Sequence, residues 1–149
     1  RASFSTHIVD LPRAAELKCP DTVVTNLVEM GGIARTVAFI RACEHFNVGF
    51  RFHSGETSVA SAAYLQVSAA MEHIREPSQT LFRWYGDDVS NEGTPVPKNG
   101  VVPVPTGPGL GVTLDPRAMK RCHERYLEEG QFPMTNTGNS GLRTRFSRV

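Results

Sequence analysis

Three polar side chains that could do chemistry, His7, Asn26 and His53, stand at the ends of short apolar segments. An imidazole titrates near neutral pH and can exchange a proton, and a side-chain amide can accept a hydrogen bond from an imidazole N–H. His53 is followed by Ser54 and Gly55, so its ring can face a pocket rather than a core. His53 is therefore the first candidate for proton transfer, with a hydrogen-bonded structural histidine as the alternative.

The elements that must position these side chains alternate between strands and helices. Apolar runs predict four strands, at Ser3–His7, Thr22–Asn26, Val48–His53 and Thr80–Trp84. The intervening segments predict helices at about Leu11–Leu17, after Gly31–Gly32 with Ile33, Val37 and Ile40 on one face, and at Ser58–His73. This alternation is typical of consecutive βα units in a parallel sheet.

The composition changes after Gly86, where Gly and Pro become frequent and the alternation of strands and helices ends. We therefore divide the chain into residues 1–85, four strands with their helices, and residues 86–149, a wrapping segment. One further helix is expected there, with Asp115 as N-cap, Pro116 in its first turn, Gly130 as its stop and a buried stripe of Met119, Cys122 and Tyr126. Four parallel strands are half of a (β/α)8 barrel, which needs about 250 residues in full.

Charge and composition exclude several classes of partner. The 149 residues carry a formal net charge of +1, which favours neither nucleic acid nor an anionic membrane. No apolar run approaches the roughly 20 residues that span a bilayer. Cys19, Cys43 and Cys122 are odd in number and widely spaced, as expected of reduced thiols in a cytoplasmic protein. The chain opens on Arg1 and runs almost at once into a strand, so we expect preceding sequence to be missing.

The segment Pro105-Thr-Gly-Pro-Gly-Leu-Gly-Val-Thr-Leu-Asp115 resembles the Pro-x-x-Pro-Gly-Leu-Gly-Val-x-Leu-Asp stretch of the mandelate racemase and glucarate dehydratase branches of the enolase superfamily. Three further pieces match in order: Ser5-Thr6-His7, Met30-Gly31-Gly32-Ile33 and His53-Ser54. The resemblance implies an α/β fold, the C-terminal half of an enolase-superfamily (β/α)8 barrel followed by the C-terminal segment of the capping domain. It also implies a site at the carboxyl ends of the strands.

The activity implied by the resemblance is a metal-dependent dehydration of a sugar acid, in which the proton next to a carboxylate is removed through a metal-stabilised enolate. A racemase or epimerase of the same superfamily is one alternative, and a non-catalytic binding homologue is another. The implied partners are a small-molecule carboxylate substrate, the missing N-terminal part of the same protein and further copies of the chain in a homo-oligomer.

His53 matches the family's catalytic histidine, which acts as general base and then as the acid for the departing hydroxyl. Asn26 stands where the family has an Asp that hydrogen-bonds this histidine. Its carbonyl can still select the tautomer of the ring, but it cannot stabilise imidazolium by charge. The alternative for Asn26 is a strand-end residue that caps a turn.

His7 matches an Asn that is a metal ligand in glucarate dehydratases. The implied cofactor is a divalent metal, Mg²⁺ by resemblance, although imidazole at this position suits an altered metal such as zinc or manganese. Contact with substrate and a structural role remain alternatives for His7. Met134 stands where the family has a substrate-binding Arg, and the pair Asp87–Asp88 matches a loop element rather than a metal site.

Overall fold

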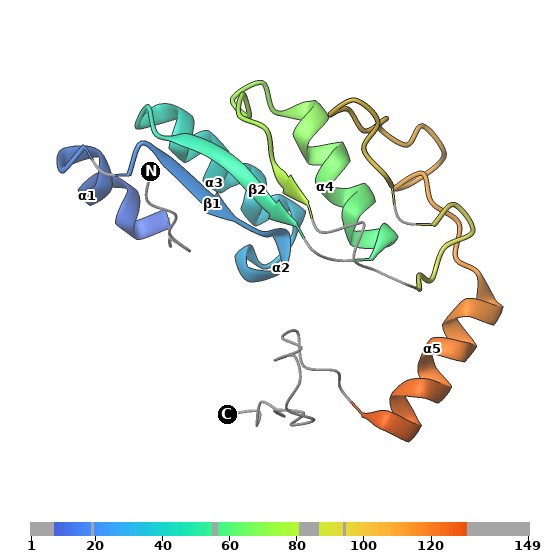
Figure 1. Cartoon of the computed structure of the whole chain (residues 1–149). Coiled ribbons are helices and arrows are strands. Elements are labelled where there is room, and N and C mark those ends of the chain that lie inside the picture. The colour runs from blue at the N-terminus through green and yellow to red at the C-terminus, as the bar shows by residue number, and fades with distance from the viewer. Residues whose placement is uncertain (1–7, 19, 55–56, 81–86, 94, 131–149) are drawn as a thin grey trace.

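A computed structural model describes residues 8–130, apart from residues 19, 55–56, 81–86 and 94. In chain order the elements are η1 (Ile8–Asp10), α1 (Leu11–Glu16), β1 (Thr22–Thr25), α2 (Leu27–Met30), α3 (Ile33–His45), β2 (Gly49–Ser54), α4 (Ser58–Ala70), β3 (Gln79–Thr80) and α5 (Pro116–Glu129). Figure 1 shows strands and helices alternating up to β3, and the described residues between β3 and α5 contain no helix. The predicted first strand and the predicted boundary at residue 85 lie outside the described residues.

The three described strands form a parallel sheet in the order β1-β2-β3. Thr25 on β1 pairs with Phe52 on β2, and His53 on β2 pairs with Gln79 on β3. The parallel pairing predicted for these strands is thus confirmed. Because all three run the same way, their carboxyl ends lie at one edge of the sheet.

The core lies between the sheet and α3 and α4. Phe50 and Phe52 are each 1% exposed, and their rings meet edge to face with centroids 5.1 Å apart. Phe39 of α3 packs on Phe50, and Tyr64 of α4 packs on Phe52 at 4.8 Å. Cys43 is buried among them, and this burial raises the pKa of its thiol to about 12, so Cys43 packs as a small apolar group.

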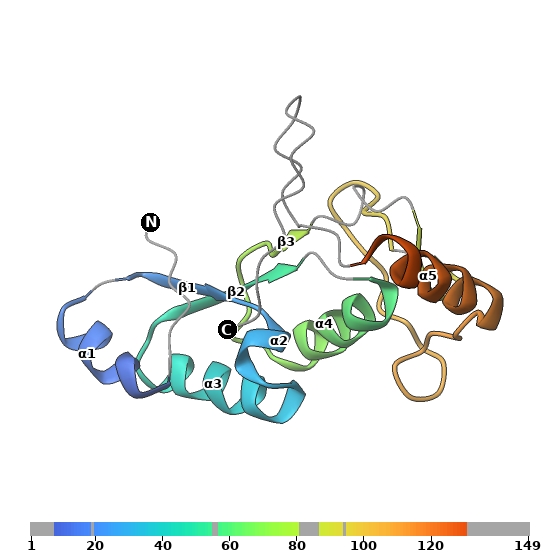
Figure 2. The same cartoon turned by 90° about the horizontal axis from the view of Figure 1, so that it is seen from below.

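Helices α1 to α4 all lie on one side of the sheet (Figure 2). Side chains alternate along a strand, so Arg51 and His53 point to the face opposite Phe50 and Phe52. No described helix covers that second face (Figure 2). In the expected half barrel, this uncovered face is the interior.

The segment before α5 runs back along α4 and is held by backbone pairing. Ser90 and Leu114 form an isolated antiparallel bridge, and Gln66 of α4 donates to the carbonyl of Pro105 at 2.7 Å. Gly111 has φ +75°, and a Cβ there would lie 2.5 Å from the Cβ of Pro105. Gly111, the second glycine of the Pro-Gly-Leu-Gly stretch, is therefore required by a tight turn.

Helix α5 has the predicted boundaries, with Asp115 accepting from Arg117 N at 2.9 Å and Gly130 as C-cap. The predicted burial of its apolar stripe was wrong. Met119 is 44% exposed and Tyr126 is 52% exposed. Apolar residues at helical spacing predict that a helix has an apolar face. The spacing does not predict which part of the protein covers that face.

The remaining differences are at element ends. The alanine-rich helix α4 stops at Ala70 rather than at His73, and the single-turn helix α2 was not expected. Asn26 and Glu29 lie at the start of α2. Across the described residues, no helix combines the length and the apolar character needed to cross a membrane.

Candidate active site

Three polar side chains lie at one level of the sheet, where β1 and β2 end and β3 begins. His53 and Gln79 are paired in the β2–β3 ladder, and Asn26 follows Thr25, which is paired with Phe52. The parallel register therefore brings Asn26, His53 and Gln79 to neighbouring strands at one level. The structure thus places the two described candidates next to each other and adds a third side chain that we did not predict.

The ring of His53 is only partly exposed, and its Nδ1 lies 3.1 Å from Oε1 of Gln79. Gln79 is the first residue of β3 and lies two residues after Pro77. An amide oxygen can only accept a hydrogen bond, so the two atoms form one when Nδ1 carries the proton. The chance of finding it from sequence was small, because it depends on the register between two strands.

Asn26 is occupied by the helix that comes directly after it. Its Oδ1 accepts from the backbone N–H of Glu29 at 2.7 Å, which makes Asn26 the N-cap of α2. The residue that follows Asn26 is Leu27, and its backbone N–H donates to the hydroxyl of Tyr64 at 2.9 Å. Among the contacts of the described residues, no hydrogen bond joins Asn26 to His53. The capping role left open by the sequence is therefore present, and a catalytic role of Asn26 stays a prediction.

Arg51 lies two residues before His53 and on the same face of β2. Its Nε atom is buried and has no hydrogen-bond partner among the described residues. Arg51 thus adds a positive charge to the uncovered face of the sheet, below the level of His53. The alternation of Phe50, Arg51, Phe52 and His53 was the signal that could have placed it there.

A metal site cannot be assembled from the described residues. They contain no group of three or more His, Cys, Asp or Glu side chains that could hold a metal ion. His7, the predicted ligand, lies outside the described residues, as does Met134. The ligand role of His7 therefore stays a prediction.

The acidic pair Asp87–Asp88 has structural contacts, as its interpretation as a loop element implied. Both carboxylate oxygens of Asp88 accept from Ser58 N, at 3.1 and 3.2 Å, and Oδ1 accepts from the Ser58 hydroxyl at 2.6 Å. Asp88 thus caps the start of α4. Asp87 pairs with Arg121 at 3.0 Å and Arg125 at 3.5 Å on α5, and the Arg121 hydrogen bond lowers the pKa of the Asp87 carboxyl.

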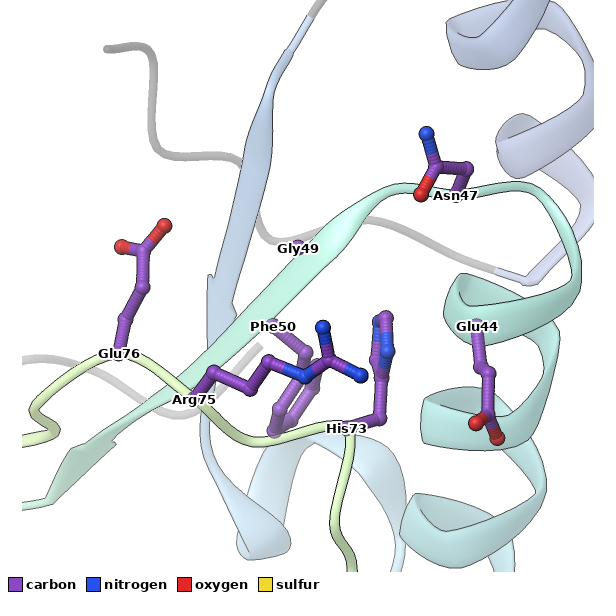
Figure 3. A pocket seen from close by; sticks show the side chains of 7 residues that line it. All are labelled: Glu44, Asn47, Gly49, Phe50, His73, Arg75 and Glu76. Carbon is purple, nitrogen blue, oxygen red and sulfur yellow. The ribbon is translucent and has the colours of Figure 1, made fainter.

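A separate cavity of about 310 Å³ opens at the amino end of β2, away from His53. Its lining residues are Glu44, Asn47, Gly49, Phe50, His73, Arg75 and Glu76. Figure 3 shows Arg75 extending across Phe50 toward His73. The imidazole of His73 contacts the carbonyl of Val48 at 2.8 Å. Because this cavity lies at the opposite end of the strand from His53, it is not part of the candidate active site.

Comparison with known proteins gives a consistent picture. Residues 5–118 match a protein family described as enolase C-terminal domain-like. A probable glucarate dehydratase of Streptomyces coelicolor is 30% identical over 100 residues, which are 66% of this chain and 23% of that protein. A chloromuconate cycloisomerase of Pseudomonas putida is 29% identical over 105 residues, 68% of this chain and 28% of that protein.

Several solved structures resemble most of the chain. One of them is an enolase from Thermobispora bispora complexed with magnesium and formate. Its TM-score is 0.75 at 32% identity, and the match covers 81% of this chain and 29% of that one. The chain therefore spans less than a third of the length of each of these three relatives.

Proposed function

Because this chain belongs to the enolase C-terminal domain-like family, we propose that it is the C-terminal part of a metal-dependent dehydratase of a sugar acid. The matched curated relatives are enzymes, a probable dehydratase and a cycloisomerase. The observation that carries the proposal is the position of His53. It stands at the carboxyl edge of a parallel sheet, on the face that no described helix covers.

In the proposed reaction His53 removes the proton from the carbon next to the substrate carboxylate. It then returns a proton to the departing hydroxyl, so that water leaves. Arg51 lies on the same face, and its positive charge favours a carboxylate substrate there. Both of these residues belong to the described sheet.

The metal dependence is proposed from the family resemblance and from the magnesium in the Thermobispora bispora structure. A divalent ion would neutralise the negative charge that develops on the substrate carboxylate. Its ligands would come from parts of the protein outside the described residues, with His7 as one of them. The described side chains do not form such a site by themselves.

Two other functions are compatible with the same geometry. A racemase or epimerase shares the first proton transfer, and it differs in the second step, where a proton returns to the same carbon and no water is lost. A non-catalytic binding homologue is favoured by one observation, the use of Asn26 as a helix cap in place of a carboxylate that supports the base.

The test is proton exchange in the full-length protein, supplied with Mg²⁺ and a panel of sugar acids in D₂O. Proton NMR measures deuterium incorporation next to the carboxylate, and loss of water distinguishes dehydration from racemisation. We expect His53→Ala to lower exchange roughly 10²–10⁴-fold, the usual contribution of a general base. His123→Ala is the matched control, because His123 is exposed on α5 and away from the sheet.

Exchange that survives in His53→Ala would refute the role of His53. If the wild-type protein binds metal but exchanges no proton of any acid in the panel, the non-catalytic homologue becomes the better account.

A further inference from the structure

We propose that Gln79 is the residue that orients His53. Its side-chain carbonyl holds the imidazole in the tautomer with the proton on Nδ1, and this leaves Nε2 free to accept a proton. The inference deepens the proposed function and rests on it for its catalytic meaning. Gln79 is a positioning residue, since it acts through His53 rather than on the substrate.

The contact between the two side chains is supported by the backbone. His53 and Gln79 are directly paired in the β2–β3 ladder, and Nδ1 lies 3.1 Å from Oε1. Residues next to each other in a parallel ladder project on the same side of the sheet. Strand pairing therefore places the imidazole and the amide next to each other, so their contact does not depend on side-chain flexibility alone.

Neighbouring contacts fix the start of β3 against the first two strands. The hydroxyl of Ser78 accepts from the backbone N–H of Phe52 at 3.1 Å, and the hydroxyl of Thr22 donates to Glu76 at 2.7 Å. These two contacts flank Gln79 on one side, and the Ser54–Thr80 pair of the ladder flanks it on the other. Gln79 is thus anchored next to the histidine.

The other neighbour of His53 does not compete for Nδ1. The Oδ1 of Asn26 accepts from Glu29 N, and the backbone after Asn26 is held by Tyr64. The strand on that side supplies no hydrogen bond to His53 among the described residues. The acceptor for the ring N–H therefore comes from β3 and not from β1.

The chemical consequence concerns charge as well as orientation. A carboxylate acceptor would select the same tautomer and also stabilise the imidazolium formed after proton transfer. A neutral amide selects the tautomer alone. Gln79 thus orients the ring as a carboxylate would, but it does not stabilise the imidazolium by charge.

The experiment reads the tautomer directly in the full-length protein with ¹⁵N-labelled histidine. The His53 resonances are assigned by their loss in His53→Gln. We expect the wild-type ring to carry its proton on Nδ1. In Gln79→Met, which keeps the side-chain length but removes the acceptor, the ratio of the Nδ1–H to the Nε2–H form should fall about fivefold, the effect of one ordinary neutral hydrogen bond.

Two further variants separate orientation from general loosening of the strand. Gln79→Glu keeps an acceptor and should keep the Nδ1–H form. Ser78→Ala removes one contact that anchors β3 but keeps the acceptor on Gln79, so it should change the tautomer ratio less than Gln79→Met does. A wild-type ring protonated mainly on Nε2, an unchanged ratio in Gln79→Met, or an equal change in Ser78→Ala would each overturn the assignment.

The tautomer and proton exchange are measured separately, so the two proposals can fail separately. If the ratio responds to Gln79→Met but no sugar acid exchanges its proton, the orienting contact stands and the dehydratase proposal falls. If exchange depends on His53 but the ratio does not respond, the dehydratase proposal stands and the role of Gln79 falls.

Discussion

Asn26 links a strand end to the next helix, and its amide oxygen is the atom that does so. The 2.7 Å contact to Glu29 N satisfies one of the backbone donors that the first turn of α2 would otherwise leave open. Asp is as good an N-cap as Asn. The two residues therefore differ here mainly in charge, which makes this position suitable for separating stability from chemistry.

We predict that Asn26→Ala lowers the free energy of unfolding by about 1 kcal/mol, because the cap is lost. Asn26→Asp should keep the cap and place a negative charge beside His53. If the proposed proton transfer by His53 is limited by the absence of a carboxylate at position 26, Asn26→Asp should speed proton exchange at neutral pH. Urea unfolding measures the first effect, and deuterium incorporation measures the second.

A slower Asn26→Asp enzyme with unchanged stability would mean that the amide serves a particular substrate. Equal losses of stability in both variants would contradict the capping role, since Asp can accept from Glu29 N in the same way.

At the scale of elements, three side chains of α5 contact one acidic side chain of the preceding segment. Asp87 pairs with Arg121 and Arg125, and the thiol of Cys122 donates to the same carboxylate at 3.5 Å. The Arg121 hydrogen bond is the main cause that lowers the pKa of Asp87 below its ordinary value of 3.8. A carboxyl with a lowered pKa contributes stability above that ordinary value and loses it as the pH falls through the lowered pKa.

We therefore predict that the contact of α5 weakens as the pH is lowered from 5 to below 3.8, the ordinary value for this carboxyl. Asp87→Asn should weaken the contact at pH 6 and remove most of its pH dependence. Amide hydrogen exchange across α5, corrected for intrinsic rates at each pH, measures both effects.

Lys120→Ala is the control for this experiment. Lys120 pairs with Glu124 within α5 at 3.7 Å, so its loss leaves the link to Asp87 in place. An Asp87→Asn protein with the same pH dependence as wild type would show that another group controls the contact.

The elements that sequence periodicity predicted well are those with a long apolar pattern. Helix α3 begins after the two glycines as expected, and α5 begins and ends at its predicted caps. Helix α2 was missed because four residues are too short to show a helical period. Asn26 followed by Glu29 three residues later was nevertheless a usable start signal.

The candidate site was only partly predictable for a different reason. His53 could be named because it ends an apolar strand and matches a family motif. Gln79 could not, because its contact depends on how β2 and β3 are aligned, and no local pattern sets that register. The burial expected for Met119 and Tyr126 failed likewise, since it depends on what lies opposite the helix.

At the scale of the whole molecule, the sheet has helices on one face only within the described residues (Figure 2). Parallel sheets are almost always covered on both faces. The uncovered face carries Arg51 and His53. The chain spans less than a third of the length of each of the three relatives described above. The missing cover is expected from the rest of the protein.

We predict that residues 1–149 expressed alone do not persist as a soluble monomer. They should self-associate through the exposed sheet, because unpaired strand edges and an open sheet face invite pairing with other chains. Co-expression with the N-terminal remainder should restore a soluble complex. Size-exclusion chromatography with light scattering measures both results, and a stable monomer of the isolated piece would contradict the half-barrel interpretation.

The cap of α4 also has a consequence for synthesis on the ribosome. Ser58, where the helix starts, is completely buried, yet the carboxylate that caps it belongs to a residue 30 positions later. Synthesis runs from the amino end, so His53 and the first turn of α4 are made before Asp88 has been added. Until then the backbone N–H of Ser58 lacks the carboxylate that accepts from it in the folded protein. The first turn of α4 therefore gains its capping carboxylate late in synthesis, although it lies in the first half of the chain.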